Sequence, residues 1–171
     1  LDGFVTGTVR PRWQDLGHLT PDEAMEVAAA WVEQMAARCF GSVCSEPAAS
    51  RLMFFLFPML PVFNLSGGHL RALEQAGHAA ATKGYRGFAQ SAAAAYREAH
   101  PMLRRLPIPP VSLDDPKSGP LIQGLLAETD WWPRRVFDEY LRGLVQKDGT
   151  SGQDPFGCDD GGQPIRCLPD G

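Results

Sequence analysis

The stretch Leu52–Phe63, "LMFFLFPMLPVF", decides the fold of this chain, because ten of its twelve residues are large and apolar and the other two are proline. A membrane-spanning helix needs about 20 apolar residues, so this run is too short to be one. Pro58 removes a backbone donor and crowds the preceding turn, which predicts that a helix ends or kinks there. We therefore expect Phe54–Phe57 to be buried all round in the core. We expect Pro58–Phe63 to leave helical geometry and to expose carbonyl groups beside a pocket.

Helix signals lie on both sides of this run. The sequence "TPDE" at Thr20–Glu23 is a capping box, which predicts a helix that continues to about Gly41. Ser45 and Pro47 predict the start of the helix that contains the apolar run. Ser66 is a cap for a third helix, from His69 to about Lys83. Further helices are expected over residues 87–100, 120–128 and 131–147.

These patterns predict a mainly α protein. With 171 residues the chain is long enough for one domain with its own core, and it is not long enough to suggest two. We expect a single domain over residues 1–171, with five to six helices in orthogonal or bundle-like packing around the central apolar helix. Residues 1–19 are expected to form an irregular, extended N-terminal arm, residues 20–148 the helical core, and residues 149–171 an irregular C-terminal tail.

The charge pattern bears on the kind of partner. The net charge is −4, and basic residues occur in pairs such as Arg104–Arg105 and Arg134–Arg135. A nucleic-acid-binding protein usually carries a basic face, so we expect no nucleic-acid partner and assign the paired arginines to the solvated surface. The first residues show no basic start followed by an apolar run, but the chain does not begin with Met, so this says nothing about secretion.

Four cysteines form two local pairs in the sequence. Cys39 and Cys44 enclose four residues, and Cys158 and Cys167 enclose eight in a tail with little apolar content. Paired cysteines at short spacing predict two disulfides, Cys39–Cys44 and Cys158–Cys167, and an extracytoplasmic protein, secreted or periplasmic. The spacing does not suit a zinc site. The alternative is four reduced thiols in a cytoplasmic protein.

Candidate catalytic residues are few. His78 follows Glu74 at helical i,i+4 spacing, and His69 lies at a predicted helix N-terminus beside the glycines of "SGG". With Tyr85, these residues are the candidates for acid–base or metal chemistry. The sequence has no P-loop or dinucleotide-binding pattern and no G-x-S-x-G, H-E-x-x-H or C-x-x-C motif, so it names no serine nucleophile, and the cofactor is unknown. In the tail, Asp154, Asp159 and Asp160 lie in a glycine-rich loop of the kind that can bind calcium.

The apolar run suggests a function in binding. Phe and Met side chains fill irregular space and tolerate different occupants, so helices around Leu52–Phe63 are suited to enclose a hydrophobic pocket. We expect a helical module that binds a hydrophobic small molecule or a protein partner. The alternatives are an all-helical enzyme with a His/Glu-based site and a structural subunit of a larger assembly. The expected ligand-binding residues are Phe54, Phe57, Met59, Phe63, His69, Trp131 and Trp132.

Overall fold

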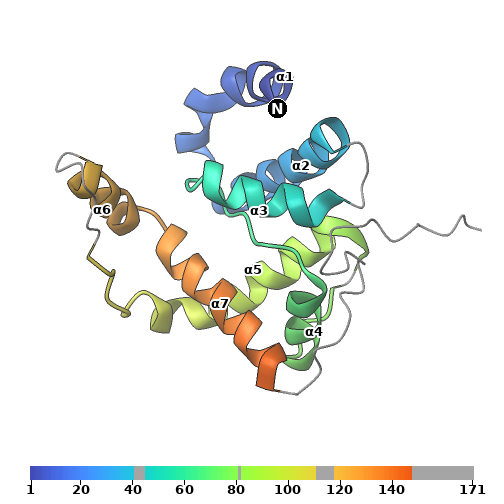
Figure 1. Cartoon of the computed structure of the whole chain (residues 1–171), viewed down its shortest axis with the longest axis vertical. Coiled ribbons are helices and arrows are strands. Elements are labelled where there is room, and N and C mark those ends of the chain that lie inside the picture. The colour runs from blue at the N-terminus through green and yellow to red at the C-terminus, as the bar shows by residue number, and fades with distance from the viewer. Residues whose placement is uncertain (41–44, 81, 111–117, 148–171) are drawn as a thin grey trace, which may run out of the picture.

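The computed structural model describes residues 1–40, 45–80, 82–110 and 118–147, and in these ranges the chain forms helices and no strand (Figure 1). The prediction of a mainly α fold with packed helices is confirmed. In chain order the elements are α1 (Asp2–Phe4), η1 (Val5–Val9), η2 (Arg10–His18), α2 (Pro21–Cys39), α3 (Glu46–Leu56), α4 (Gly67–Gln75), α5 (Gly84–Leu103), α6 (Ser118–Glu128) and α7 (Trp131–Lys147).

The start of α2 confirms the capping box. The Thr20 hydroxyl accepts a hydrogen bond from the Glu23 amide at 3.3 Å, and the Glu23 carboxylate accepts one from the Thr20 amide at 2.8 Å. Two amides that would otherwise lack partners at the helix start are thus satisfied. This bond from the Thr20 amide also lowers the pKa of the Glu23 carboxyl. The residues of "TPDE" therefore fix where the first long helix begins.

Two sets of helix contacts build the core. Helix α2 packs on α3 and α5, and helix α7 packs on α4 and α5, so α5 joins the two sets. Between α5 and α7 lies an aromatic group in which the rings of Phe63, Tyr96 and Phe137 have centroids 5.5 to 6.2 Å apart. On the other side, the Trp31 ring of α2 contacts Phe57 at 5.7 Å in an edge-on arrangement. Edge-on aromatic contacts of this kind add to the stabilisation from apolar burial.

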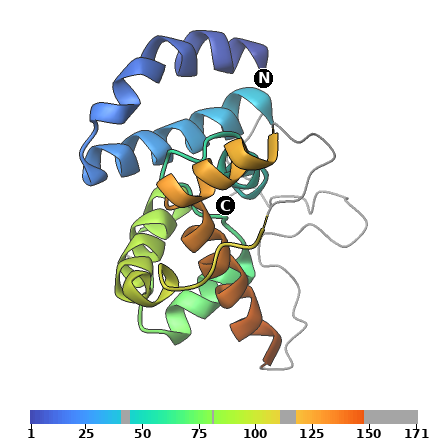
Figure 2. The ribbon, with the colours of Figure 1, turned by 90° about the vertical axis from the view of Figure 1, so that its left-hand side faces the viewer.

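The first 18 residues differ from the expected extended arm. They form successive short turns of α, π and 3-10 helix that lie along one side of α2 (Figure 2). Phe4 is 2 % exposed and its ring lies 6.4 Å from that of Trp31, and Val9 is also buried. The two buried side chains are five residues apart, with the π-helical turn of Val5–Val9 between them. The prediction of an extended backbone is wrong, because the glycines and Pro11 are accommodated within irregular helical turns.

Helix α3 is not buried all round, contrary to expectation. Phe54 and Phe57 are buried in the core, but Phe55 is 54 % exposed and Leu56 is 44 % exposed. Helix α3 packs mainly on α2, so the residues on the opposite face of its last turn are largely exposed. The exposed Phe55 ring still contacts Trp131 of α7, with centroids 6.1 Å apart.

Two predicted helix ends were misplaced. Helix α4 ends at Gln75 because Gly77 adopts a φ of +83° and the His78 amide bonds back to the Leu73 carbonyl at 2.7 Å. This pairing is a Schellman motif, which terminates a helix. Helix α5 instead continues through Pro101 to Leu103. A proline in the last turn costs a single amide hydrogen bond, and burial of Leu103 offsets that loss.

Helix α6 makes few contacts with the rest of the chain. In Figure 1 it stands apart from the core, and within the described ranges it packs mainly on α7. Leu121 is 75 % exposed, and Ile122 and Leu125 are also exposed. None of the described helices combines the length and the apolar character needed to cross a bilayer.

The predicted disulfides and the calcium loop fall mostly outside the described residues. Cys39 is half-buried and forms no disulfide with another described residue. Its predicted partner Cys44 lies outside the described ranges, as do Cys158, Cys167 and the acidic residues Asp154, Asp159 and Asp160. Both disulfides, the calcium site and the extracytoplasmic location therefore stay predictions.

Candidate functional site

An irregular segment, residues 57–66, runs through the protein interior between α3 and α4. As predicted from Pro58, the chain leaves helical geometry here, yet Leu60, Val62, Phe63 and Leu65 are each at most 5 % exposed. A buried segment without regular structure must find partners for its backbone groups elsewhere, because unpaired buried carbonyls and amides are costly. In this chain the partners are side chains from four helices.

Arg134 of α7 serves three carbonyls of this segment. Its Nη2 donates to Pro58 O at 2.6 Å, and its Nη1 donates to Leu60 O and, at 3.2 Å, to Val62 O. The guanidinium is 3 % exposed, and its centre lies 5.9 Å from the centroid of the Phe54 ring, which places a cation over an aromatic face. Burial lowers the pKa of Arg134 to about 10, so it still carries its charge at neutral pH.

Three more side chains complete the support of the segment. The buried Tyr85 hydroxyl accepts from the Phe63 amide at 3.1 Å and donates to the Phe63 carbonyl at 3.0 Å. The Ser50 hydroxyl accepts from the Leu65 amide at 3.0 Å, and His69 Nδ1 lies 2.6 Å from the Asn64 carbonyl. These contacts hold the segment in one conformation and make it a rigid wall for the cavities beside it.

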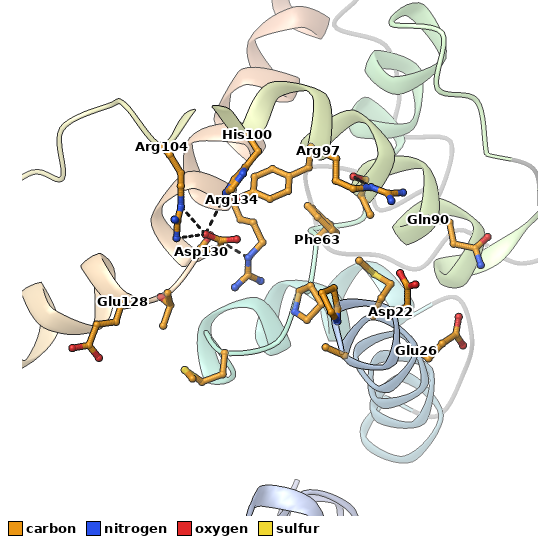
Figure 3. Close-up of a pocket in the computed structure, with 18 residues that line it drawn as sticks. Asp22, Glu26, Phe63, Gln90, Arg97, His100, Arg104, Glu128, Asp130 and Arg134 are labelled. Atoms are coloured by element: carbon orange, nitrogen blue, oxygen red, sulfur yellow. Dashed lines mark hydrogen bonds and ion pairs between the residues drawn. The ribbon is translucent and has the colours of Figure 1, made fainter. Parts of the chain in front are cut away.

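One of these cavities, here called the cleft, has a volume of about 810 Å³ and is bounded by α2, α5, the α6–α7 junction and the 57–66 segment (Figure 3). This size is within the range of small-molecule sites. The lining residues are Pro21, Asp22, Ala24, Met25 and Glu26 of α2; Met59, Pro61 and Phe63 of the segment; Gln90, Ala93, Tyr96, Arg97, His100 and Arg104 of α5 or its C-terminal cap; and Glu128, Thr129, Asp130 and Arg134.

The floor of the cleft is apolar. Met25 and Met59 contribute flexible thioether side chains, and Pro61, Phe63 and Ala93 contribute rigid apolar surface. Met59 is 58 % exposed, so its apolar side chain is accessible to solvent. A surface of this kind favours an apolar ligand, because burial of apolar area releases about 25 cal/mol per Å².

Charged side chains gather at one end of the cleft. The Asp130 Oδ1 accepts from Arg104 Nη2 at 3.0 Å and Nε at 3.2 Å, and it lies 3.4 Å from His100 Nε2 (Figure 3). Asp130 therefore serves two basic groups at once. Arg134 adds a positive charge at the same end of the cleft, and its hydrogen bonds within the described chain go to carbonyl groups. The Glu128 carboxylate also lines this end, so the two arginines are balanced by two carboxylates.

The Tyr96 hydroxyl is the second unusual group in the cleft. Tyr96 is 8 % exposed, and its hydroxyl has no hydrogen-bond partner within the described part of the chain. Burial, with a smaller contribution from the Asp130 charge, raises the pKa of this hydroxyl, so it remains a donor at neutral pH. Its ring lies 5.2 Å from the ring of His100. A buried donor without an acceptor favours a ligand with an acceptor group.

The predicted ligand-binding residues are divided among three environments. Met59 and Phe63 line the cleft, and His69 lines a second, smaller cavity. Phe54 and Phe57 are part of the core. Trp131 packs on Phe54 and donates from its indole nitrogen to the Phe54 carbonyl at 3.0 Å, and the buried Trp132 indole nitrogen has no partner among the described residues.

The predicted catalytic residues do not share a cavity. Glu74 is exposed on α4, and His78 lies 3.3 Å from Glu98 of α5 instead of pairing with Glu74. Tyr85 is fully buried and bonds the backbone of Phe63. The described part of the chain contains no group of three or more His, Cys, Asp or Glu side chains placed to hold a metal.

Sequence reasoning missed Tyr96, Asp130 and Arg134, and it favoured a solvated or capping role for His100 over a metal or acid–base role. One signal for Arg134 was present, because Arg134, Phe137 and Leu141 follow i, i+3, i+7 spacing and so share the buried face of α7. Reading Arg134 together with Arg135 as a surface pair concealed this spacing. Comparison of the chain with protein-family models, curated proteins and solved structures finds no match.

Proposed function

We propose that this protein binds a small molecule with an apolar body and an anionic head group in the cleft. The observation that carries the proposal is the Tyr96 hydroxyl, which has no partner among the described residues and shares the cleft with Arg104, Arg134 and an apolar surface. In this pose the apolar body lies on Met25, Met59 and Phe63, and the head group accepts from Tyr96. This proposal keeps the hydrophobic small ligand expected from the sequence and adds a charge to it.

The site can be tested with decanoate and with decanol, its uncharged counterpart of equal chain length. Isothermal titration calorimetry on the full chain is expected to show saturable binding of decanoate and weaker binding of decanol. Tyr96→Phe removes only the hydroxyl, and it should weaken decanoate binding about tenfold, as expected for a buried hydrogen bond to a charged group. The matched control is Tyr140→Phe on the exposed face of α7, which should bind as the unchanged protein does.

Blocking the cleft provides a second arm. Ala93 is half-buried in the floor, and Ala93→Trp would fill part of the volume that the apolar body needs. Both decanoate and decanol should then bind more weakly. The proposal is wrong if neither compound binds the unchanged protein, or if Tyr96→Phe and Tyr140→Phe bind decanoate equally well.

Acid–base catalysis in the same cleft is the second candidate function. It is supported by the 3.4 Å approach of His100 Nε2 to Asp130, the arrangement in which a carboxylate orients a histidine. The lining includes no serine or cysteine, and the Thr129 hydroxyl donates to the Leu125 carbonyl at 2.8 Å, so general acid–base chemistry fits better than a covalent mechanism. For any substrate that is turned over, His100→Gln should abolish turnover and leave substrate binding within about twofold.

A protein partner, also expected from the sequence, would use a different surface. Leu121, Ile122 and Leu125 expose apolar area on α6, away from the floor of the cleft. Partner binding on α6 and ligand binding in the cleft would use different residues. We therefore expect Leu121→Glu to leave decanoate binding unchanged.

A further inference from the structure

A second cavity lies between α3, α4 and α7 and shares no lining residue with the cleft. Its volume is about 330 Å³, and we call it the arginine pocket. It is lined by Arg51 and Phe55 of α3, by Asn64, Leu65 and Ser66 of the irregular segment, by His69 of α4, and by Arg135 and Arg142 of α7. All three residues of fixed charge in this lining are arginines.

The carboxylates near these arginines lie behind the pocket wall. Asp138 Oδ2 lies 3.0 Å from Arg135 and 3.1 Å from Arg142, and Glu139 also contacts both arginines. Neither carboxylate lines the pocket. A guanidinium has five N–H donors, so each of these arginines keeps donors beyond those the carboxylates use.

Arg51 adds a charge that no carboxylate balances. Its side chain is exposed and makes no ion pair within the described part of the chain. Three arginines face two carboxylates, which leaves one positive charge in excess at the pocket. Helix α4 also begins here, since its cap Ser66 and its residue His69 both line the cavity, and a helix N-terminus attracts anions.

Two buried polar atoms at the pocket lack partners. His69 is 3 % exposed and Asn64 is 7 % exposed, and His69 Nε2 and Asn64 Oδ1 have no hydrogen-bond partner among the described residues. His69 Nδ1 lies 2.6 Å from the Asn64 carbonyl and so carries a hydrogen, which leaves Nε2 as an acceptor in the neutral ring. Asp138 Oδ1, which accepts from Asn64 Nδ2 at 2.9 Å, is 3.6 Å from Nε2, beyond hydrogen-bond distance. The Asn64 amide orientation is fixed by this bond to Asp138, so its oxygen is also an acceptor without a donor.

We propose that the arginine pocket is a binding site for a phosphate group. The arginines bind the anionic oxygens, because a guanidinium matches the geometry of a phosphate with two parallel donors. The two unpartnered acceptors call for a ligand that also carries a hydroxyl, and the P–OH of hydrogen phosphate supplies one. Sulfate has the same shape and no hydroxyl at neutral pH, so the pocket should prefer phosphate.

The test uses inorganic phosphate and glycerol 3-phosphate on the full chain at pH 7, with ionic strength held constant by sodium chloride. Calorimetric titration should show saturable binding of at least one compound, and binding of the ester alone would indicate an esterified ligand. Sulfate should bind about tenfold more weakly, since it leaves a buried acceptor unpaired. Equal affinity for sulfate would overturn the role of Asn64 and His69.

Arg51→Gln is the informative variant, because Arg51 is exposed and its loss leaves the core unchanged. We expect at least about fivefold weaker phosphate binding, and no saturable binding for Arg51→Glu. The matched control is Arg105→Gln, an exposed arginine at the end of α5 that should leave affinity unchanged. The proposal is overturned if neither phosphate compound binds, which would mean that the pocket holds only water, or if Arg51→Glu binds phosphate normally.

Discussion

Arg134 Nη2 donates a 2.6 Å hydrogen bond to the carbonyl of Pro58, a residue 76 positions earlier in the chain. Pro58 ends the helical path of the apolar run, and Arg134 satisfies the carbonyl groups that this break leaves in the interior. The wall that separates the cleft from the core therefore depends on one buried cation. A change at Arg134 should therefore affect both the stability of the fold and the shape of the cleft.

Substitution of Arg134 should be costly. Arg134→Met keeps much of the side-chain volume and leaves three carbonyls without their donor, so we expect the free energy of unfolding to fall by about 3 kcal/mol. Arg134→Lys should recover part of the loss, because an ammonium group cannot reach all three carbonyls in the same geometry. Urea denaturation measures both, and Arg105→Met is the exposed control. Equal stability of the Arg134→Met and Arg105→Met proteins would contradict this role.

Tyr85→Phe tests the second support of the irregular segment. The change removes a hydroxyl that both donates to and accepts from the Phe63 backbone and leaves the ring in place. Two buried backbone groups then lack a partner, so the expected loss is about 1–3 kcal/mol of unfolding free energy. Tyr140→Phe, on an exposed ring, should change stability little. Thermal unfolding of the two variants in parallel would refute the prediction if their midpoints agreed.

Gly87 and Gly143 should respond in opposite directions to alanine. A Cβ at Gly87 would lie 2.0 Å from the Thr82 carbonyl oxygen, so Gly87→Ala forces the backbone apart and should destabilise the protein by about 1–3 kcal/mol. A Cβ at Gly143 of α7 meets no atom within 4 Å. Gly143→Ala should therefore stabilise the helix by about 0.5–1 kcal/mol. A gain in melting temperature for Gly87→Ala would show that the Thr82 contact is relaxed in solution.

Glu46 predicts a pH dependence of stability. Desolvation raises the pKa of its carboxyl in the folded state, and the hydrogen bond from the Tyr85 amide opposes this to a smaller extent. The folded state thus binds this proton more tightly than the unfolded state does. The resulting stabilisation is fully present below pH 4.5, the ordinary value, and is lost as the pH rises through the raised folded value.

The variant Glu46→Gln keeps an acceptor for the Tyr85 amide and removes the charge. At pH 7 it should melt about 1–2 °C above the unchanged protein, a small gain because the carboxylate is partly solvated. The difference should narrow at pH 4. Glu74→Gln, at an exposed position on α4, is the control. If the difference in melting temperature between Glu46→Gln and the unchanged protein grew at lower pH, the prediction would be wrong.

Local sequence signals were sufficient for most helix starts. The capping box at Thr20–Glu23 and the cap at Ser66 depend on neighbouring residues; α2 and α7 begin where the sequence predicts, and α4 begins directly after Ser66, two residues before the predicted His69. The helix ends at Gln75 and Leu103 were misjudged. A glycine with positive φ, and a proline tolerated in a last turn, depend on how the following residues pack.

The candidate site was only partly predictable. The break at Pro58 indicated the correct wall of the cleft, with Met59 and Phe63 on it. Tyr96 and His100 are four residues apart on α5, so helical spacing alone brings them together, but no local pattern states that Asp130, directly before α7, meets them. The approach of Asp130 results from the packing of α5 on α7, which is a property of the whole chain.

The support of residues 57–66 also has a consequence for synthesis on the ribosome. Ser50 precedes this segment, but Tyr85 and Arg134 follow it. Until α7 has emerged from the ribosome, the growing chain contains the apolar run and residues 57–66 without Arg134 to bond their carbonyl groups. This stage lasts long after the segment itself has been made. The final packing of the N-terminal half must wait for the C-terminal half, so ribosome-bound chains that end before α7 should be more sensitive to protease in this segment than chains that include it.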